Sequence, residues 1–275
     1  MPTPTTGTLK VPGATLHYET RGSGPLLLLI PGGAADAGLY AGMADGLAAH
    51  RTVASYDPRG FSRSPLGGPL TDQRVDVWSD DAHRLIELLS PDEPASVLGC
   101  SSGAVVALDL LARHPERLRR VVAHEPPLVE VLDDPAPHRR LFVEVRETLR
   151  RDGVGPAMAR FSEGLGGRPG EQPTELPPEI QEMAARMHAN LPVFLEHVLC
   201  PFTATAPDVA ALRHAAAGRL VLAAGRDSRE QEALYGPARL LAERVGGEFA
   251  EFPGGHVGAT EQPKEFAEQL LTLLG

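Results

Sequence analysis

Ser101 lies at the centre of a Gly-x-Ser-x-Gly sequence, Gly99-Cys100-Ser101-Ser102-Gly103. An apolar run, residues 95–98, precedes this sequence, and residues 103–114 follow it with apolar side chains at helical spacing. A strand-to-helix turn of this kind is too tight for side chains on both sides of the serine, so glycines flank it. The start of a helix also favours developing negative charge. We predict that Ser101 is a nucleophile; the alternative is a glycine-rich turn without a catalytic role.

A serine hydroxyl needs a general base, and the base needs an acid that orients it. Among the ten histidines, His256 lies in a glycine-rich loop, residues 252–258, after the last expected strand, residues 248–252. A loop at the far end of a sheet can bring a histidine to the serine. We predict His256 as the general base; the alternative is a histidine on a surface loop.

The acid has two candidates, each at the end of an expected strand. Asp227 follows the strand at residues 220–224, and Glu125 follows the strand at residues 120–123. We favour Asp227 because its loop enters the last strand–loop unit, which carries His256. The chain order Ser101, Asp227, His256 is then the order serine, acid, histidine of a known triad. Glu125 remains the alternative acid and is otherwise expected to line the substrate pocket.

Two backbone N–H groups must face the oxyanion that forms when a carbonyl is attacked. Ser102 directly follows the nucleophile and is predicted to supply one N–H group. The segment after the apolar run 26–30 reads Pro31-Gly32-Gly33-Ala34-Ala35, and its glycines let the backbone approach a substrate closely. We predict Gly33 as the second donor, with Ala34 as the alternative donor and as part of the pocket.

The elements that position these residues follow from the hydrophobic pattern. Short apolar runs alternate with longer stretches of helical spacing, such as residues 76–89 and the C-terminal end of the chain. Runs of this length are typical of strands buried on both faces of a parallel sheet, so the fold class is a doubly wound α/β fold. Residues 8–20, with Pro12 and Gly13 in the middle, predict an antiparallel hairpin at its edge.

The alternation stops between residues 126 and 218, where helical pieces occur without a convincing strand. The pieces lie at residues 139–151, 179–190 and 193–199, and a Pro/Gly-rich stretch, residues 164–178, divides them. Ser101 precedes this insertion while Asp227 and His256 follow it. We therefore predict one catalytic core, residues 1–126 and 219–275, with residues 127–218 as a helical cap; the alternative is an independent second domain.

Three further residues are weaker candidates for the pocket. Met158 and Met187 lie in the insertion, where methionines can line an adaptable apolar cavity, although ordinary packing explains them as well. Val257 directly follows the predicted base.

Composition limits the partners. The 275 residues include 26 basic and 36 acidic side chains, a net charge of −10, which disfavours binding to nucleic acid or an anionic membrane. The longest apolar run, residues 26–30, is far shorter than the roughly 20 residues of a membrane helix. No signal peptide is evident at residues 1–13, so the expected location is cytoplasmic. The sequence does not indicate an oligomeric state.

Neither a metal nor a cofactor is expected. The two cysteines, Cys100 and Cys200, are too few for a disulfide scaffold or a four-cysteine zinc site. The sequence also has no phosphate-binding loop, dinucleotide fingerprint or spaced cluster of metal ligands. We expect Cys100 to pack against the sheet.

Along nearly its whole length the sequence resembles the α/β-hydrolase fold family. The landmarks are the Pro-Gly-Gly segment, residues 56–64, the Gly-x-Ser-x-Gly sequence, Gly225-Arg226-Asp227 and Gly255-His256. The resemblance implies an eight-stranded, mostly parallel sheet with helices on both faces, a helical cap after the sixth strand, and a Ser–His–Asp triad.

Two positions depart from the family pattern. Pro31 stands where many members have histidine, and Ser62 stands where a second glycine is usual. In the loop around Ser62 we expect Asp57 and Arg59 to form an ion pair that holds its conformation.

The sequence thus predicts a serine hydrolase that cleaves a small-to-medium, largely apolar carboxylic ester or lactone through an acyl-enzyme on Ser101. Three alternatives use the same site for acyl transfer, for C–C bond hydrolysis or for cyclisation in a biosynthetic pathway. A fourth is a ligand-binding module with a vestigial triad.

Overall fold

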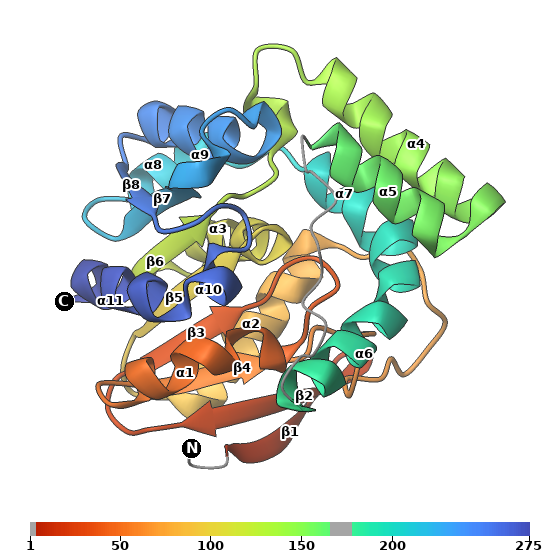
Figure 1. Cartoon of the computed structure of the whole chain (residues 1–275). Coiled ribbons are helices and arrows are strands. Elements are labelled where there is room, and N and C mark those ends of the chain that lie inside the picture. The colour runs from red at the N-terminus through yellow and green to blue at the C-terminus, as the bar shows by residue number, and fades with distance from the viewer. Residues whose placement is uncertain (1–3, 166–177) are drawn as a thin grey trace.

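Eight strands form one sheet in the order β1-β2-β4-β3-β5-β6-β7-β8 (Figure 1). The computed structural model describes residues 4–165 and 178–275. All neighbours from β4 to β8 are parallel, whereas β2 pairs antiparallel with both β1 and β4. The strands are β1 (Thr5–Val11), β2 (Ala14–Arg21), β3 (Leu26–Ile30), β4 (Thr52–Tyr56), β5 (Ala95–Cys100), β6 (Leu118–His124), β7 (Leu220–Gly225) and β8 (Glu248–Phe252). The predicted eight-stranded, mostly parallel sheet is confirmed.

The expected edge hairpin is β1–β2. Its register pairs Thr5 with Thr20 and Val11 with Ala14, so the turn consists of Pro12 and Gly13. Gly13 has a φ of 79°, a left-handed conformation that glycine adopts without steric cost.

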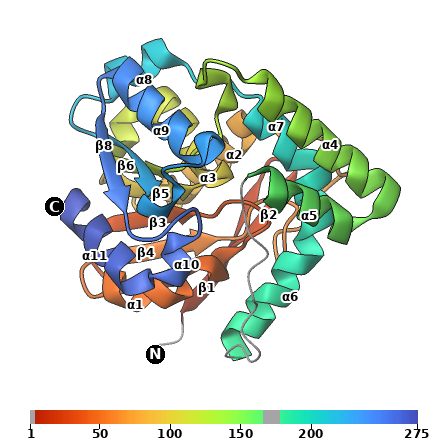
Figure 2. The same cartoon turned by 45° about the horizontal axis from the view of Figure 1, so that its top comes forward.

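Helices cover both faces of the sheet (Figures 1 and 2). Alternate side chains of β3 point to opposite faces, so Leu26, Leu28 and Ile30 join one hydrophobic cluster while Leu27 and Leu29 join the other. The first cluster includes residues of α2 (Val75–Leu89), α3 (Ser102–Arg113), α8 (Val209–Ala215) and α9 (Glu232–Val245). The second includes residues of α1 (Ala41–Ala48), α10 (Gly258–Glu261) and α11 (Pro263–Leu274).

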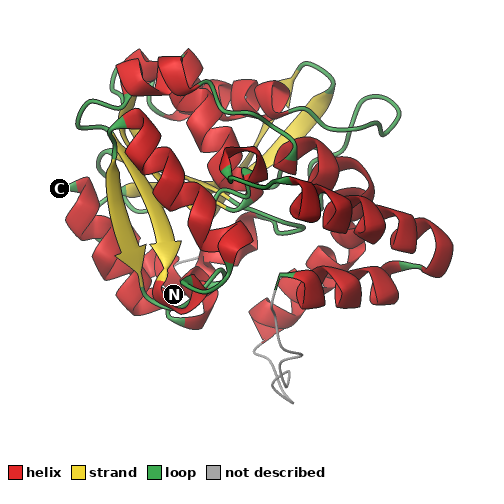
Figure 3. Cartoon of the chain, turned by 90° about the horizontal axis from the view of Figure 1, so that it is seen from above, coloured by secondary structure: helices red, strands yellow, loops and turns green. Residues whose placement is uncertain are grey.

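A helical cap follows β6, as predicted. It contains α4 (Ala136–Asp152), α5 (Val154–Gly164), α6 (Pro178–Val193), a π-helical turn (Phe194–Val198) and α7 (Leu199–Thr203). Figure 3 shows these helices to one side of the sheet. The next helix, α8, packs between α3 and α9 instead.

Most of the Pro/Gly-rich stretch predicted within the insertion, residues 166–177, lies outside the described residues. The division into residues 1–126 with 219–275 and residues 127–218 stays a prediction, as does the cytoplasmic location. Within the described ranges, no helix is both long and apolar enough to cross a membrane.

Candidate active site

Ser101 occupies a strained turn between β5 and α3. Its φ of 53° and ψ of −124° are unfavourable for a residue with a side chain, and its N–H group donates to the carbonyl oxygen of His124 at 2.9 Å. A Cβ atom on Gly99 would lie 2.3 Å from the carbonyl oxygen of Gly103, and one on Gly103 would lie 2.3 Å from that of Ile30. The turn therefore requires glycine on both sides of the serine, as the motif predicts.

The segment after β3, residues 31–36, packs directly on this turn; we call it the glycine loop. A Cβ atom on Gly32 would lie 2.2 Å from the carbonyl oxygen of Cys100 and 2.6 Å from Cβ of Ser101. Gly33 has a left-handed φ of 60°, and its N–H group donates to Oγ of Ser102 at 3.0 Å. The glycine loop thus lies beside the serine, and the roles of Gly33 and Ser102 as oxyanion donors stay predictions.

His256 pairs with Glu125. Nδ1 of His256 lies 2.6 Å from Oε2 of Glu125, whose side chain is fully buried. The other carboxylate oxygen, Oε1, accepts the N–H group of Gly225 at 2.7 Å. Burial raises the pKa of Glu125, but the hydrogen bond and charge of His256, helped by the Gly225 N–H group, lower it below its ordinary value. Glu125 is therefore held as a carboxylate against the imidazole ring.

The backbone of Glu125 explains this placement. Its φ of 47° is left-handed, and its N–H group donates to the carbonyl oxygen of Ala223 on β7 at 2.8 Å. This turn directs the side chain across the carboxyl end of β7 toward the loop that carries His256, residues 253–257.

The prediction that Asp227 orients His256 is wrong. Asp227 lies in a 3₁₀ turn, Arg226–Ser228, that begins directly after β7, and its side chain is exposed. Its N–H group donates to the carbonyl oxygen of Gly254 at 3.0 Å, so the turn lies beside the loop that carries His256. Glu125, the alternative acid, occupies the position beside Nδ1 of His256.

Ser101 and His256 line one pocket. Eight lining residues come from the insertion after β6 and all but one are apolar: Pro127, Phe142, Phe161, Leu165, Phe194, Leu199, Phe202 and Thr203. The other walls are Ser102, Ala233 and Leu234. The pocket is thus apolar except for Thr203, the two serines and the histidine.

The residues predicted to line this pocket do not line it. Glu125 lies beneath His256, Ala34 is buried in the glycine loop, and Val257 is 51% exposed. Met158 and Met187 pack, partly buried, against the first hydrophobic cluster, so ordinary packing is the correct interpretation. The phenylalanines of the cap were not predicted; no local motif marks them, since they are distant in sequence from Ser101.

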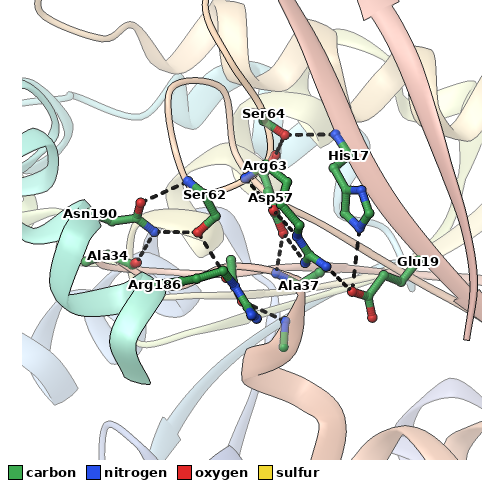
Figure 4. Close-up of polar contacts among 12 residues, drawn as sticks. His17, Glu19, Ala34, Ala37, Asp57, Ser62, Arg63, Ser64, Arg186 and Asn190 are labelled. Carbon is green, nitrogen blue, oxygen red and sulfur yellow. Dashed lines mark hydrogen bonds and ion pairs between the residues drawn. The ribbon is translucent and has the colours of Figure 1, made fainter. Parts of the chain in front are cut away.

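A partly buried polar network joins the cap to the glycine loop (Figure 4). We call it the cap–loop network; its residues are Asp36, Ser62, Arg186 and Asn190. Asn190 of α6 donates through Nδ2 to the carbonyl oxygen of Ala34 and to Oγ of Ser62, both at 2.9 Å. Its Oδ1 accepts the N–H group of Ser62 at 2.9 Å. One amide side chain therefore connects α6 to two loops of the core.

Asp36 is the charged centre of this network. Its side chain has no exposed surface and accepts hydrogen bonds from Arg186, from the Gly38 N–H group at 2.9 Å and from the Ser62 hydroxyl at 2.9 Å. Burial raises the pKa of Asp36, but Arg186, the Gly38 amide and Ser62 together lower it below its usual value. Asp36 is thus an ionised, fully paired carboxylate.

Ser62 accounts for the departure from the family pattern. Its φ of 45° is left-handed, which explains why glycine is usual at this position. The serine side chain adds the contacts to Asp36 and Asn190, which glycine cannot make.

The predicted ion pair between Asp57 and Arg59 is wrong. Asp57 pairs with Arg63 through two hydrogen bonds of 2.8 and 2.9 Å, and it also accepts the Ala37 N–H group. Arg59 pairs with Asp81 of α2 at 2.7 and 2.6 Å. Each residue holds the loop through a partner other than the one the sequence indicated.

Two buried residues near the serine are chemically quiet. Burial raises the pKa of the Cys100 thiol to about 12, so the thiol stays protonated and packs in the second hydrophobic cluster, as expected. Burial lowers the pKa of His124 to about 4, and its ring contacts Phe252 and Phe266 edge-on. No group of His, Cys, Asp and Glu side chains suited to a metal ion occurs in the described part of the chain.

The fold and this site define a class of enzyme, the α/β hydrolases. A family model described as "alpha/beta hydrolase fold" matches residues 25–163, and the chain belongs to this family. Within it, the chain is 37% identical over 271 residues to the uncharacterized hydrolase YraK of Bacillus subtilis (strain 168), covering 98% of this chain and 95% of that protein.

Two other proteins extend the comparison. A zearalenone hydrolase of Bionectria ochroleuca is 29% identical over 216 residues, 76% of each chain. The structure of a thermophilic esterase from Thermogutta terrifontis superposes with a TM-score of 0.75 at 19% identity, covering 99% of this chain and 98% of the esterase. The protein is accordingly a hydrolase of the α/β family.

Proposed function

We propose that this protein is a serine hydrolase that cleaves a largely apolar carboxylic ester or lactone through an acyl-enzyme on Ser101. One observation carries the proposal: the 2.6 Å contact between Nδ1 of His256 and buried Glu125, in a pocket that Ser101 shares with His256. This contact fixes Nδ1 as the protonated nitrogen, which leaves Nε2 free to accept a proton.

The proposed reaction has two halves. In the first, Nε2 of His256 takes the proton of Ser101 as Oγ attacks the carbonyl carbon, and the protonated ring then gives that proton to the departing alkoxide. In the second, His256 takes a proton from water as the water oxygen attacks the acyl carbon; the ring then returns that proton to Oγ of Ser101 as the C–O bond to the serine breaks and the acid leaves. Glu125 stabilises the imidazolium in both halves, and the Ser102 N–H group at the start of α3 donates to the oxyanion.

The substrate class follows from the lining of the pocket. Four phenylalanines and three leucines surround the serine end, so a charged or strongly polar acyl group would lose its hydration without compensating hydrogen bonds. The relative named zearalenone hydrolase supports including zearalenone among the test substrates.

The test is a panel of nitrophenyl esters of increasing acyl length, aromatic esters, small lactones and zearalenone, with Ser101→Ala as the matched variant. We expect the variant to lose about 10⁴–10⁶-fold in kcat on the best substrate, because the nucleophile is gone while the pocket remains. A fluorophosphonate should label the wild-type protein at Ser101 and leave the variant unlabelled. Wild-type-like turnover by Ser101→Ala would contradict the mechanism.

The same panel separates the alternative functions. Product identification by mass spectrometry distinguishes hydrolysis from acyl transfer, C–C bond hydrolysis or cyclisation. A protein that binds ligands without catalysis would resist the fluorophosphonate.

A further inference from the structure

The side chain of Ser102 lies at the reacting end of the pocket. Ser102 is the first residue of α3, is 3% exposed, and lines the cavity together with Ser101 and His256. Its backbone N–H group is the oxyanion donor of the proposed function. The hydroxyl of the same residue has no assigned role.

The Ser102 hydroxyl accepts a hydrogen bond from the protein, but among the described residues it has no acceptor for its own proton. Its Oγ accepts the N–H group of Gly33 at 3.0 Å, and among the described residues this is its only hydrogen-bond partner. A serine hydroxyl has one O–H donor and two lone pairs, so the proton of Ser102 has no protein acceptor. Unlike other buried hydroxyls without a partner, such as that of Ser96, this donor belongs to the lining of the pocket, where a bound ligand can supply its acceptor.

We propose that the Ser102 hydroxyl is an oxyanion donor, so that Ser102 supplies both an N–H and an O–H group to the substrate carbonyl oxygen. Gly33 acts behind it: its N–H group donates to Oγ, which polarises the hydroxyl and strengthens the bond that the hydroxyl donates. No proton is transferred in this step; the O–H group stays intact and its hydrogen bond strengthens as charge develops. The inference rests on the proposed function.

An alternative arrangement, in which the Gly33 N–H group contacts the oxyanion, predicts the opposite effect of Ser102→Ala on turnover. If the Gly33 N–H group itself faced the oxyanion during the reaction, the Ser102 hydroxyl would compete with the substrate for that donor. Removing the hydroxyl would then free Gly33 and leave turnover unchanged or faster. Under our proposal, removing it eliminates a donor that contacts the oxyanion.

The experiment compares Ser102→Ala, Ser102→Thr and Ser96→Ala on the best ester. Ser96 is a buried serine on β5 whose hydroxyl has no partner among the described residues, so it is a matched control for the loss of a hydroxyl group. We expect Ser102→Ala to lose about 10²–10³-fold in kcat with little change in KM. Ser102→Thr, which keeps the hydroxyl, should recover most of that loss, and Ser96→Ala should turn over as the wild type does.

A second readout uses a boronic acid, which forms a tetrahedral adduct with the nucleophile. Its inhibition constant for Ser102→Ala should rise in parallel with the fall in kcat/KM. Turnover by Ser102→Ala equal to or above that of Ser96→Ala would overturn the inference alone, since the wild type would still hydrolyse esters. Absence of fluorophosphonate labelling in the wild type would overturn the proposed function as well.

Discussion

Three residues with side chains adopt a left-handed backbone among the described residues: Ser62, Ser101 and Glu125. Such conformations cost about 1–3 kcal/mol each for a non-glycine residue and persist where surrounding contacts require them. Ser101 lines the pocket, Glu125 contacts His256, and Ser62 joins the cap–loop network. Backbone strain in this protein is therefore concentrated in and around the candidate active site.

The acid can be tested by two matched neutral substitutions. Glu125→Gln keeps the size of the side chain but cannot stabilise an imidazolium, so we expect kcat/KM to fall by about 10³–10⁴-fold. Asp227→Asn removes an exposed carboxylate that does not contact His256, so we expect a change within about threefold. Steady-state kinetics on the best ester measure both.

The reverse pattern, a large loss for Asp227→Asn and a small one for Glu125→Gln, would restore Asp227 as the acid. Thermal unfolding of both variants serves as the folding control, because Glu125 is buried and also accepts the Gly225 N–H group.

At the scale of single residues, the sequence predicts those features of the site that neighbouring residues determine. The turn at Ser101 could be predicted because five consecutive residues determine it. The partner of His256 could not, because it depends on the φ of Glu125 and on the turn that carries Asp227 away after β7. Both candidates follow a strand, and the sequence does not show which side chain crosses the sheet edge.

At the scale of elements, helix α6 is attached to the core by polar contacts. Asn190 is 4% exposed and connects Ala34 of the glycine loop with Ser62 of the loop after β4. Two of its three hydrogen bonds are to backbone groups, the Ala34 carbonyl oxygen and the Ser62 N–H group, so Asn190 acts on the position of the loops.

We expect Asn190→Ala to lower the free energy of unfolding by about 1–3 kcal/mol, because it leaves the Ser62 N–H group and the Ala34 carbonyl without partners. Turnover should fall as well, since the glycine loop packs against Ser101. His188→Ala, an exposed substitution on the same helix, is the control and should change stability by less than about 0.5 kcal/mol. Urea unfolding and ester kinetics are the measurements. Equal stability of the two variants would show that the network does not hold α6.

The contacts of α6 could not have been predicted. The helix itself was expected, but Asn190 and Ser62 are 128 positions apart in sequence. Asp57 shows a second limit: its partner is Arg63 rather than Arg59, the nearest opposite charge along the chain. Helical periodicity shows that a helix forms and which face is apolar; it does not identify distant polar partners.

At the scale of the whole molecule, His124 links the site to the hydrophobic core. Its pKa of about 4 in the folded protein lies below the ordinary value of 6.5, because burial disfavours the charged ring. The unfolded chain therefore binds a proton at a higher pH than the folded protein does. Above about pH 6.5 the titration of His124 does not change the free energy of unfolding. As the pH falls from 6.5 toward 4, the free energy of unfolding decreases, because only the unfolded chain takes up the proton.

A shift of this size corresponds to as much as about 3 kcal/mol between pH 6.5 and pH 4. We expect His124→Leu to remove this part of the pH dependence, since leucine does not titrate. Urea unfolding of the wild type and the variant at intervals across this range measures the difference. Parallel curves for the two proteins would contradict the expectation. Below about pH 4.5 the lowered pKa values of Asp36 and Glu125 add a further loss in both proteins.

The fold could be predicted more fully than the pocket. Buried strands and the hairpin turn are encoded by neighbouring residues, and the break in alternation after β6 indicates the cap. The pocket wall is formed by side chains from α4, α5, the π-helical turn and α7, which meet only when the cap is folded onto the sheet. No pattern along the sequence distinguishes these phenylalanines from ordinary core residues.

The position of Glu125 before the cap has a consequence for how such a protein can diversify. Ser101, the glycine loop and Glu125 all precede the insertion, and only His256 follows it. Recombination that replaced the predicted cap, residues 127–218, with a segment of different length would exchange most of the pocket wall. The serine, the carboxylate and the β5–β6 pairing between them would be inherited unchanged.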